Sequence, residues 1–231
     1  MKKIFHFALM AAMLLPSALL LNACGGDDKD DPDSGDVDAR LEKVIPSDIR
    51  RQMEKYMTIY DGVNPPNVEG IYLMSPQKLV YDSTNNFDTD HKFADLIMNL
   101  FNQNSKNNTI DYKERQGSNL SASGNGAFIS GEGNNFSIYF NTSGNSHGIS
   151  YKTALVVSGT ISSDGIRNLY YAFVMTDKGS DPEHTIMNVG DYRVFKDGDG
   201  LAVNSEWPSS TRVEDLMDGT INLMNSLVAN N

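Results

Sequence analysis

The chain has 231 residues, with 30 acidic side chains against 19 Lys and Arg and a formal net charge of -11 at pH 7. This balance disfavours binding to nucleic acid or to anionic surfaces, because no basic stripe offsets it. The single cysteine excludes a disulfide within the chain. The length is ample for one domain with its own core.

Residues 1–23 are typical of a secretory signal peptide. The chain starts with Met-Lys-Lys, continues with an apolar stretch from Ile4 to Leu21 and then reaches small residues. A retained transmembrane helix is the alternative. His6 and Pro16 interrupt the stretch, which falls short of the roughly 20 apolar residues that a span needs.

The only cysteine, Cys24, follows Leu21-Asn22-Ala23 directly. A thiol in this place can act as a nucleophile toward a lipid donor. Leu21, Ala23 and Cys24 resemble the bacterial lipobox, in which the cysteine becomes the lipidated N-terminus. The resemblance implies acyl chains on Cys24, each contributing about 0.8 kcal/mol per buried methylene to membrane anchoring. We therefore expect a protein held on a membrane rather than across it.

Residues 24–43 are rich in acids, Gly, Pro and Ser, and predict a flexible tether, because they cannot bury enough apolar surface to fold. The acids Asp27, Asp28, Asp30 and Asp31 follow the cysteine closely. They resemble the export signal of surface-exposed lipoproteins in Bacteroidetes. The resemblance implies an outer-membrane protein that faces the cell surface, with the periplasmic face as the alternative.

The folded domain is predicted over residues 44–231 and opens with a helix. Ser47 can cap it, and Asp61-Gly62 ends it. Its apolar residues recur at helical spacing: Ile49, Met53, Tyr56, Met57 and Tyr60.

Beyond Pro66 the pattern alternates with the period of a strand. Residues 68–74 and 78–81 flank Ser75-Pro76-Gln77, which predicts a hairpin or a sharp corner. Phe136, Ile138 and Phe140 share one strand face. Further strands are predicted over 109–115, 127–130, 135–141, 151–162, 169–176 and 192–196. About eight short strands favour a mainly β domain, either an antiparallel barrel or a sandwich.

Two segments depart from this pattern. Residues 93–101 fit a helix or a strand, and the Asn-rich sequence after them favours a strand. Thr211 and Glu214 form a candidate capping box before apolar residues that extend to Leu227, which predicts a C-terminal helix.

The stretch from Val68 to Pro76, VEGIYLMSP, resembles the Gly-x-aromatic entry strand of lipocalin-like barrels, with Tyr72 in the place of their tryptophan. Over residues 46–207 the pattern is similar to uncharacterised Bacteroidetes lipoproteins of that kind. The resemblance implies a barrel with room for a small apolar or amphipathic ligand. Tyr72, Tyr139 and Tyr171 are the candidate ligand-contacting aromatic residues.

No catalytic, cofactor or metal site is predicted. His91, His147 and His184 lie in polar turns without the spacing of metal ligands, and no nucleophile elbow or phosphate loop occurs. Residues 197–200, Asp-Gly-Asp-Gly, begin like a calcium loop, but Leu201 and Ala202 follow where such a loop needs a ligand and a glycine, which favours a hairpin turn. A catalytic carboxylate pair remains open, because its pairing would be spatial.

Two further interpretations concern the surface. Asp82-Ser83-Thr84 resembles the motif at which Bacteroides glycosylates exported proteins, with Ser83 as the acceptor, although a plain strand end carries the same residues. An exposed row of strand tyrosines would suit a surface glycan-binding or accessory subunit, whereas core packing is the alternative. Its candidates are Tyr139, Tyr151, Tyr170, Tyr171 and Tyr192. The sequence thus predicts a non-catalytic binding protein and leaves the oligomeric state open.

Overall fold

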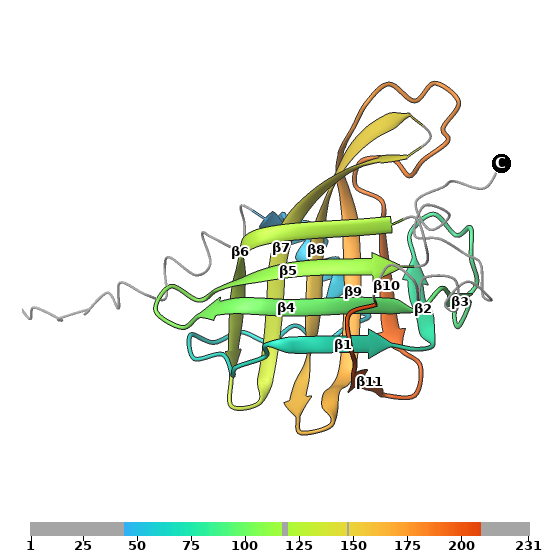
Figure 1. Cartoon of the computed structure of the whole chain (residues 1–231). Helices are drawn as coiled ribbons and strands as arrows, with labels where there is room; N and C mark the ends of the chain where they lie inside the picture. The colour runs from blue at the N-terminus through green and yellow to red at the C-terminus, as the bar shows by residue number, and fades with distance from the viewer. Residues whose placement is uncertain (1–43, 117–119, 147, 209–231) are drawn as a thin grey trace, which may run out of the picture. The chain divides into compact units, whose positions relative to one another are not determined.

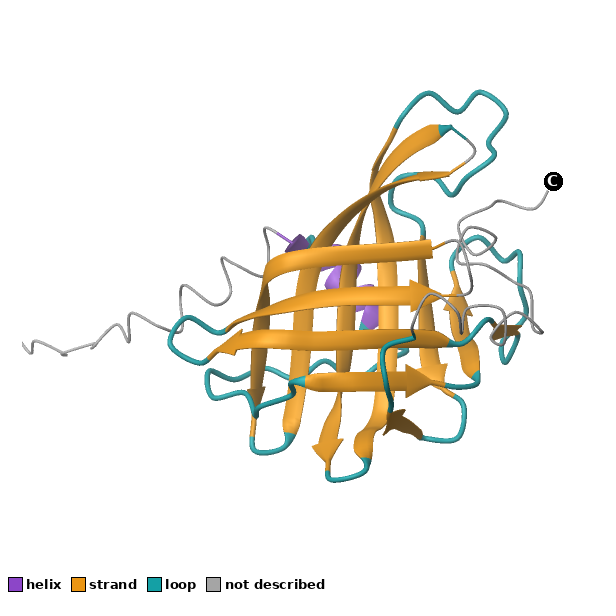
Figure 2. Cartoon of the chain, in the orientation of Figure 1, coloured by secondary structure: helices purple, strands orange, loops and turns teal. Residues whose placement is uncertain are grey.

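The computed structural model describes residues 44–116, 120–146 and 148–208, which are mainly β (Figure 2). One short helix, α2 (Ser47–Met53), precedes the strands. The strands are β1 (Gly70–Met74), β2 (Gln77–Asp82), β3 (Lys92–Phe93), β4 (Leu96–Asn104), β5 (Thr109–Gln116), β6 (Leu120–Glu132), β7 (Asn135–Ser146), β8 (Ile149–Ser162), β9 (Gly165–Lys178), β10 (Tyr192–Asp197) and β11 (Leu201–Asn204). The predicted signal peptide, tether and C-terminal helix lie outside the described residues.

The eleven strands form one antiparallel sheet (Figure 1). Neighbouring strands follow the order β11-β1-β4-β5-β6-β7-β8-β9, and β9 pairs again with β11. These eight strands therefore make a ring of hydrogen-bonded neighbours, called the ring below. The remaining strands β10, β2 and β3 continue the sheet from β9. The predicted mainly β, antiparallel fold is confirmed.

Ser75-Pro76 is a sharp corner, which is the second of the two alternatives that the sequence predicts. β1 pairs with β11 and β4, whereas β2 pairs with β10 and β3. The turn 197–200 is not a hairpin either, because β10 and β11 both pair with β9 and not with each other. The chain turns a corner at both places. The two corners lie side by side, because β1 pairs with β11 and β2 pairs with β10.

The inner face of the ring carries the main core. All eight ring strands contribute buried apolar side chains to one cluster. β5 shows the pattern most clearly: Ile110, Tyr112, Glu114 and Gln116 are buried, and the residues between them are partly exposed. Phe136, Ile138 and Phe140 share the inner face of β7, as the alternation predicts. Residues 96–104 form strand β4, so the segment 93–101, which fits a helix or a strand by its sequence, is mainly a strand.

A second apolar cluster covers the outer face of β6 to β10. It joins Met53 and Met57 to outward side chains such as Tyr139, Val156 and Val174. Ser130, Ser137 and Ser158, from three adjacent strands, hydrogen-bond the backbone of residues 58–60. The helix is shorter than predicted and ends at Met53. Ser47 is its first residue and not its cap, because Pro46 is the N-cap and no side chain caps the helix.

Candidate functional site

A polar cluster crosses the interior of the ring. Glu114 on β5 accepts hydrogen bonds from the hydroxyls of Tyr112 and of Tyr171 on β9, the latter at 3.2 Å. β5 and β9 are four strands apart in either direction around the ring, so this contact joins opposite walls. We call Tyr112, Glu114 and Tyr171 the crossbar. All three side chains are at most 1% exposed.

Burial controls the ionisation of the crossbar. Desolvation raises the pKa of Glu114 to about 7, against an opposing effect of the two phenol hydrogen bonds. Burial, with the negative charge of Glu114 as the next cause, raises the pKa of Tyr112 and of Tyr171 well above 10. Glu114 is therefore the crossbar group that titrates near neutral pH.

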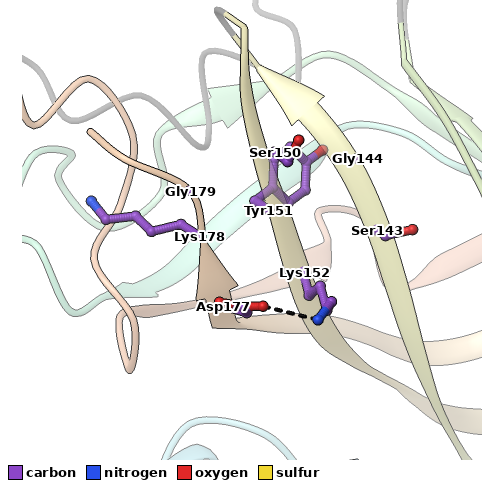
Figure 3. Close-up of a pocket in the computed structure, with 8 residues that line it drawn as sticks. All are labelled: Ser143, Gly144, Ser150, Tyr151, Lys152, Asp177, Lys178 and Gly179. Atoms are coloured by element: carbon purple, nitrogen blue, oxygen red, sulfur yellow. Dashed lines mark hydrogen bonds and ion pairs between the residues drawn. The ribbon is translucent and has the colours of Figure 1, made fainter.

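A recess of about 520 Å³ lies at one end of the ring, over the ends of β7, β8 and β9 (Figure 3). Lys152 of β8 and Asp177 of β9, which are cross-strand neighbours lining the recess, form an ion pair at 2.9 Å. Lys178 turns toward the loop after β9 and binds Asp181 at 2.8 Å. The residues that line the recess are Ser143, Gly144, Ser150, Tyr151, Lys152, Asp177, Lys178 and Gly179. Both lysines that line the recess are thus neutralised by carboxylates.

Tyr151 belongs both to the recess and to the interior. It lines the recess, and its side chain is 8% exposed within the inner core cluster. Burial, followed by the charge of Glu114, raises the pKa of Tyr151. Gly144 is its cross-strand partner on β7, and a side chain at Gly144 would overlap the Tyr151 hydroxyl. The glycine allows the tyrosine to lie across β7.

The structure separates the three predicted ligand-contacting tyrosines. Tyr72 and Tyr171 lie in the inner cluster, whereas Tyr139 lies on the outer face beneath α2. Of the predicted row of tyrosines, Tyr139, Tyr151, Tyr171 and Tyr192 are at most 8% exposed, so they form no platform at the surface. The core-packing interpretation of these rings is the one that the structure supports.

Other predicted positions have structural roles. Ser83 lies at the end of β2, half-buried, and its Oγ accepts a hydrogen bond from the Tyr192 backbone at 2.9 Å. The Asp197 carboxylate accepts hydrogen bonds from four backbone amides, those of Ser75, Asp199, Gly200 and Leu201. It therefore closes the turn 197–200 and ties it to the Ser75 corner.

Several predicted sites lie outside the described residues. Leu21, Ala23, Cys24 and the acids Asp27, Asp28, Asp30 and Asp31 are among them, as is His147. Within the described ranges, no group of three or more His, Cys, Asp or Glu could hold a metal ion. No helix in those ranges is both long and apolar enough to cross a membrane.

Comparison with known proteins gives no relative. No family model, no curated protein and no solved structure matches the chain.

Sequence reasoning did not single out Glu114. The available signal was its place in β5, where the alternation puts one carboxyl on the same face as Ile110 and Tyr112. A charged residue on the apolar face of a strand is rarely buried without a special environment. Its partner Tyr171 lies 57 residues further along the chain, so the crossbar itself has no local pattern.

Proposed function

We propose that this chain is a lipid-anchored, non-catalytic binding protein of the cell envelope, and that its ring is a lipocalin-like barrel. Acyl chains on Cys24 hold the protein on the outer membrane, and the acids after it direct the domain to the cell surface. The lipobox resemblance supports the anchor, and a ring of eight antiparallel strands is compatible with the barrel.

The observation that carries the binding function is the recess of about 520 Å³ that reaches Tyr151. Ligand pockets commonly have volumes of about 300–1,000 Å³ and combine apolar walls with a few polar groups. Tyr151 offers a ring, while Ser143, Lys152 and Asp177 offer polar groups. This combination suits a small amphipathic ligand.

The ligand binds at the end of the ring and not at its centre. The centre is occupied by the side chains of the inner cluster and by the crossbar. A surface glycan function has less support, because four of the five candidate tyrosines are buried.

Titration with the neutral fluorescent amphiphile N-phenyl-1-naphthylamine tests this function. We expect saturable binding to the full-length chain and at least tenfold weaker binding to Ser143→Trp, because the indole fills the recess. Lys196→Trp is the matched control. It places the same side chain in a second recess, of about 280 Å³, near the turn 197–200, and should bind as the unchanged protein does. Absence of saturable binding, or equal loss in both variants, would refute the proposal.

A further inference from the structure

The outer face of β11, β1, β4 and β5 carries apolar side chains that belong to neither core cluster. These four strands are neighbours in the sheet and lie side by side in Figure 1. Their inward side chains alternate with outward ones, so cross-strand partners form rows on the outer face. Leu73 is the partner of Val203 on one side and of Ile97 on the other. We call the apolar residues of this face the outer row: Val203, Leu73, Ile97, Ile71 and Phe101.

The outer row is an interaction surface. The helix α2 packs over β6 to β10 on the other side of the molecule (Figure 2). Val203, by contrast, is 42% exposed. An apolar sheet face is ordinarily packed against another element, because a domain is stable only when such faces are buried. The outer row therefore calls for a partner with an apolar stripe.

The chain itself leads residues 209–231 to this face. Beyond β11, the ring of Trp207 lies 4.4 Å from the ammonium group of Lys113, which stands on the outer face of β5. The same ammonium group lies 5.8 Å from the ring of Phe101 in the outer row. The described part of the chain thus reaches Pro208 beside the outer row.

The residues that follow have the pattern of an amphipathic helix. Apolar side chains recur at three- and four-residue spacing after the candidate capping box of Thr211 and Glu214. A helix over residues 213–227 would be about 22 Å long, at about 1.5 Å per residue. Four neighbouring strands, spaced by about 4.8 Å, cover about 19 Å. One such helix therefore matches the width of the outer row. Its apolar residues are Val213, Leu216, Met217, Ile221, Met224 and Leu227.

The charges on the two surfaces are complementary. Lys113 and Arg115 stand on the outer face of β5, and among the described residues neither forms an ion pair. The acids of the C-terminal segment gather at the start of the predicted helix: Glu214, Asp215 and Asp218. The match favours a helix that begins over β5 and runs toward β11.

We propose that residues 211–227 form an amphipathic helix that docks on the outer row, with its first turn over β5. The partner of this surface is therefore a segment of the same chain. Docking covers β11, β1, β4 and β5 as α2 covers β6 to β10. The inference does not depend on the binding function, because the recess lies over β7, β8 and β9.

Photo-crosslinking of the full-length chain identifies what covers the outer row. The photoreactive residue p-benzoylphenylalanine replaces Leu73, and mass spectrometry identifies the linked peptide. We expect cross-links within one chain to residues 211–227. The same photoreactive residue in place of Lys55, an exposed residue after α2, is the control and should give none to this segment. Cross-links between two copies of the chain, or none to residues 211–227, would overturn the proposal.

Limited digestion with trypsin provides the second arm, because Arg212 is the only Lys or Arg in residues 209–231. A docked helix protects the bond after Arg212. Leu216→Asp puts a charge on the apolar side of the helix and should speed this cleavage at least tenfold. Asn222→Asp, on the polar side, is the control and should leave the rate unchanged. Equal rates in the unchanged protein and both variants would contradict docking.

Val203→Asp tests the outer row itself. Val203 is 42% exposed, so the change spares the core and should speed the cleavage after Arg212 at least fivefold. Val189→Asp is the matched control, since it changes another exposed valine, 57% exposed, in the loop between β9 and β10. It should cleave as the unchanged protein does. The same rate in both variants would show that the helix does not dock on the outer row.

Discussion

Glu114 makes folding stability depend on pH. Burial raises its folded-state pKa to about 7 from the ordinary value of 4.5. The native state therefore binds a proton that the unfolded state has already released between these values. The stabilising effect of the protonated form is complete below about pH 4.5 and is lost as the pH rises through 7. The loss is on the order of 3 kcal/mol.

We predict that Glu114→Gln removes this dependence. The amide keeps the shape and the hydrogen-bonding capacity of the carboxyl without a charge to desolvate. Denaturant unfolding at pH 5 to pH 8 should show a smaller decrease in the free energy of unfolding than in the unchanged protein, and greater stability at pH 8. Glu132→Gln, at an exposed carboxyl, is the control. The same pH dependence in all three proteins would contradict the burial argument.

Gly144 is predicted to be intolerant of a side chain. A methyl group there would overlap the Tyr151 hydroxyl, so Gly144→Ala must displace the ring and should cost about 1–3 kcal/mol. Gly179→Ala is a matched control in the same recess, because the nearest atom to its added carbon would be 3.5 Å away. Thermal unfolding distinguishes the two. Equal effects would show that the Tyr151 position is not tightly held.

At the scale of residues, the sequence predicts the strand face of a side chain better than it predicts which residues that side chain contacts. The alternation places Phe136 and Phe140 on one face of their strand and Tyr139 on the other, and the structure shows that the first face is the inner one. The crossbar and the ion pair of Lys152 with Asp177 join residues far apart in the chain. Such pairings depend on strand order, which local patterns do not encode.

At the scale of elements, Asp197 holds the corner where two bent strands meet. Its carboxylate accepts four backbone hydrogen bonds, one of them from Ser75. We predict that Asp197→Ala lowers the free energy of unfolding by about 1–3 kcal/mol, because partly buried amides lose their acceptor. Asp164→Ala, in the exposed turn between β8 and β9, should change it by less than about 0.5 kcal/mol. Equal denaturation midpoints would contradict this role.

The elements most open to prediction are those with a long, regular pattern. β5 alternates clearly, β8 and β9 contain long apolar runs, and each of β5, β7, β8 and β9 has a predicted strand within it. The corner at Ser75-Pro76 was less predictable, because a short polar turn between two apolar segments fits a hairpin equally well. The helix ends early because residues 58–60 leave it to hydrogen-bond three serines of the sheet, a tertiary contact without a local signal.

At the scale of the whole molecule, the proposal assigns location and binding to separate parts of the chain. We predict that Cys24→Ser abolishes lipid attachment, so the protein no longer incorporates labelled palmitate and leaves the membrane fraction. Ligand binding by the domain should be unchanged. Ser34→Ala, in the predicted tether, is the control and should remain with the membranes. Membrane association of Cys24→Ser with undiminished labelling would contradict the anchor.

The central claim is that the recess over β7, β8 and β9 is the ligand site. Its most direct test is an NMR titration of the full-length chain with N-phenyl-1-naphthylamine, which follows the backbone amides. We predict the largest chemical-shift changes at Gly144, Tyr151 and Gly179, and small changes at Gly198 and Gly200 of the second recess. Changes centred elsewhere on the ring, or none at saturating ligand, would contradict the claim.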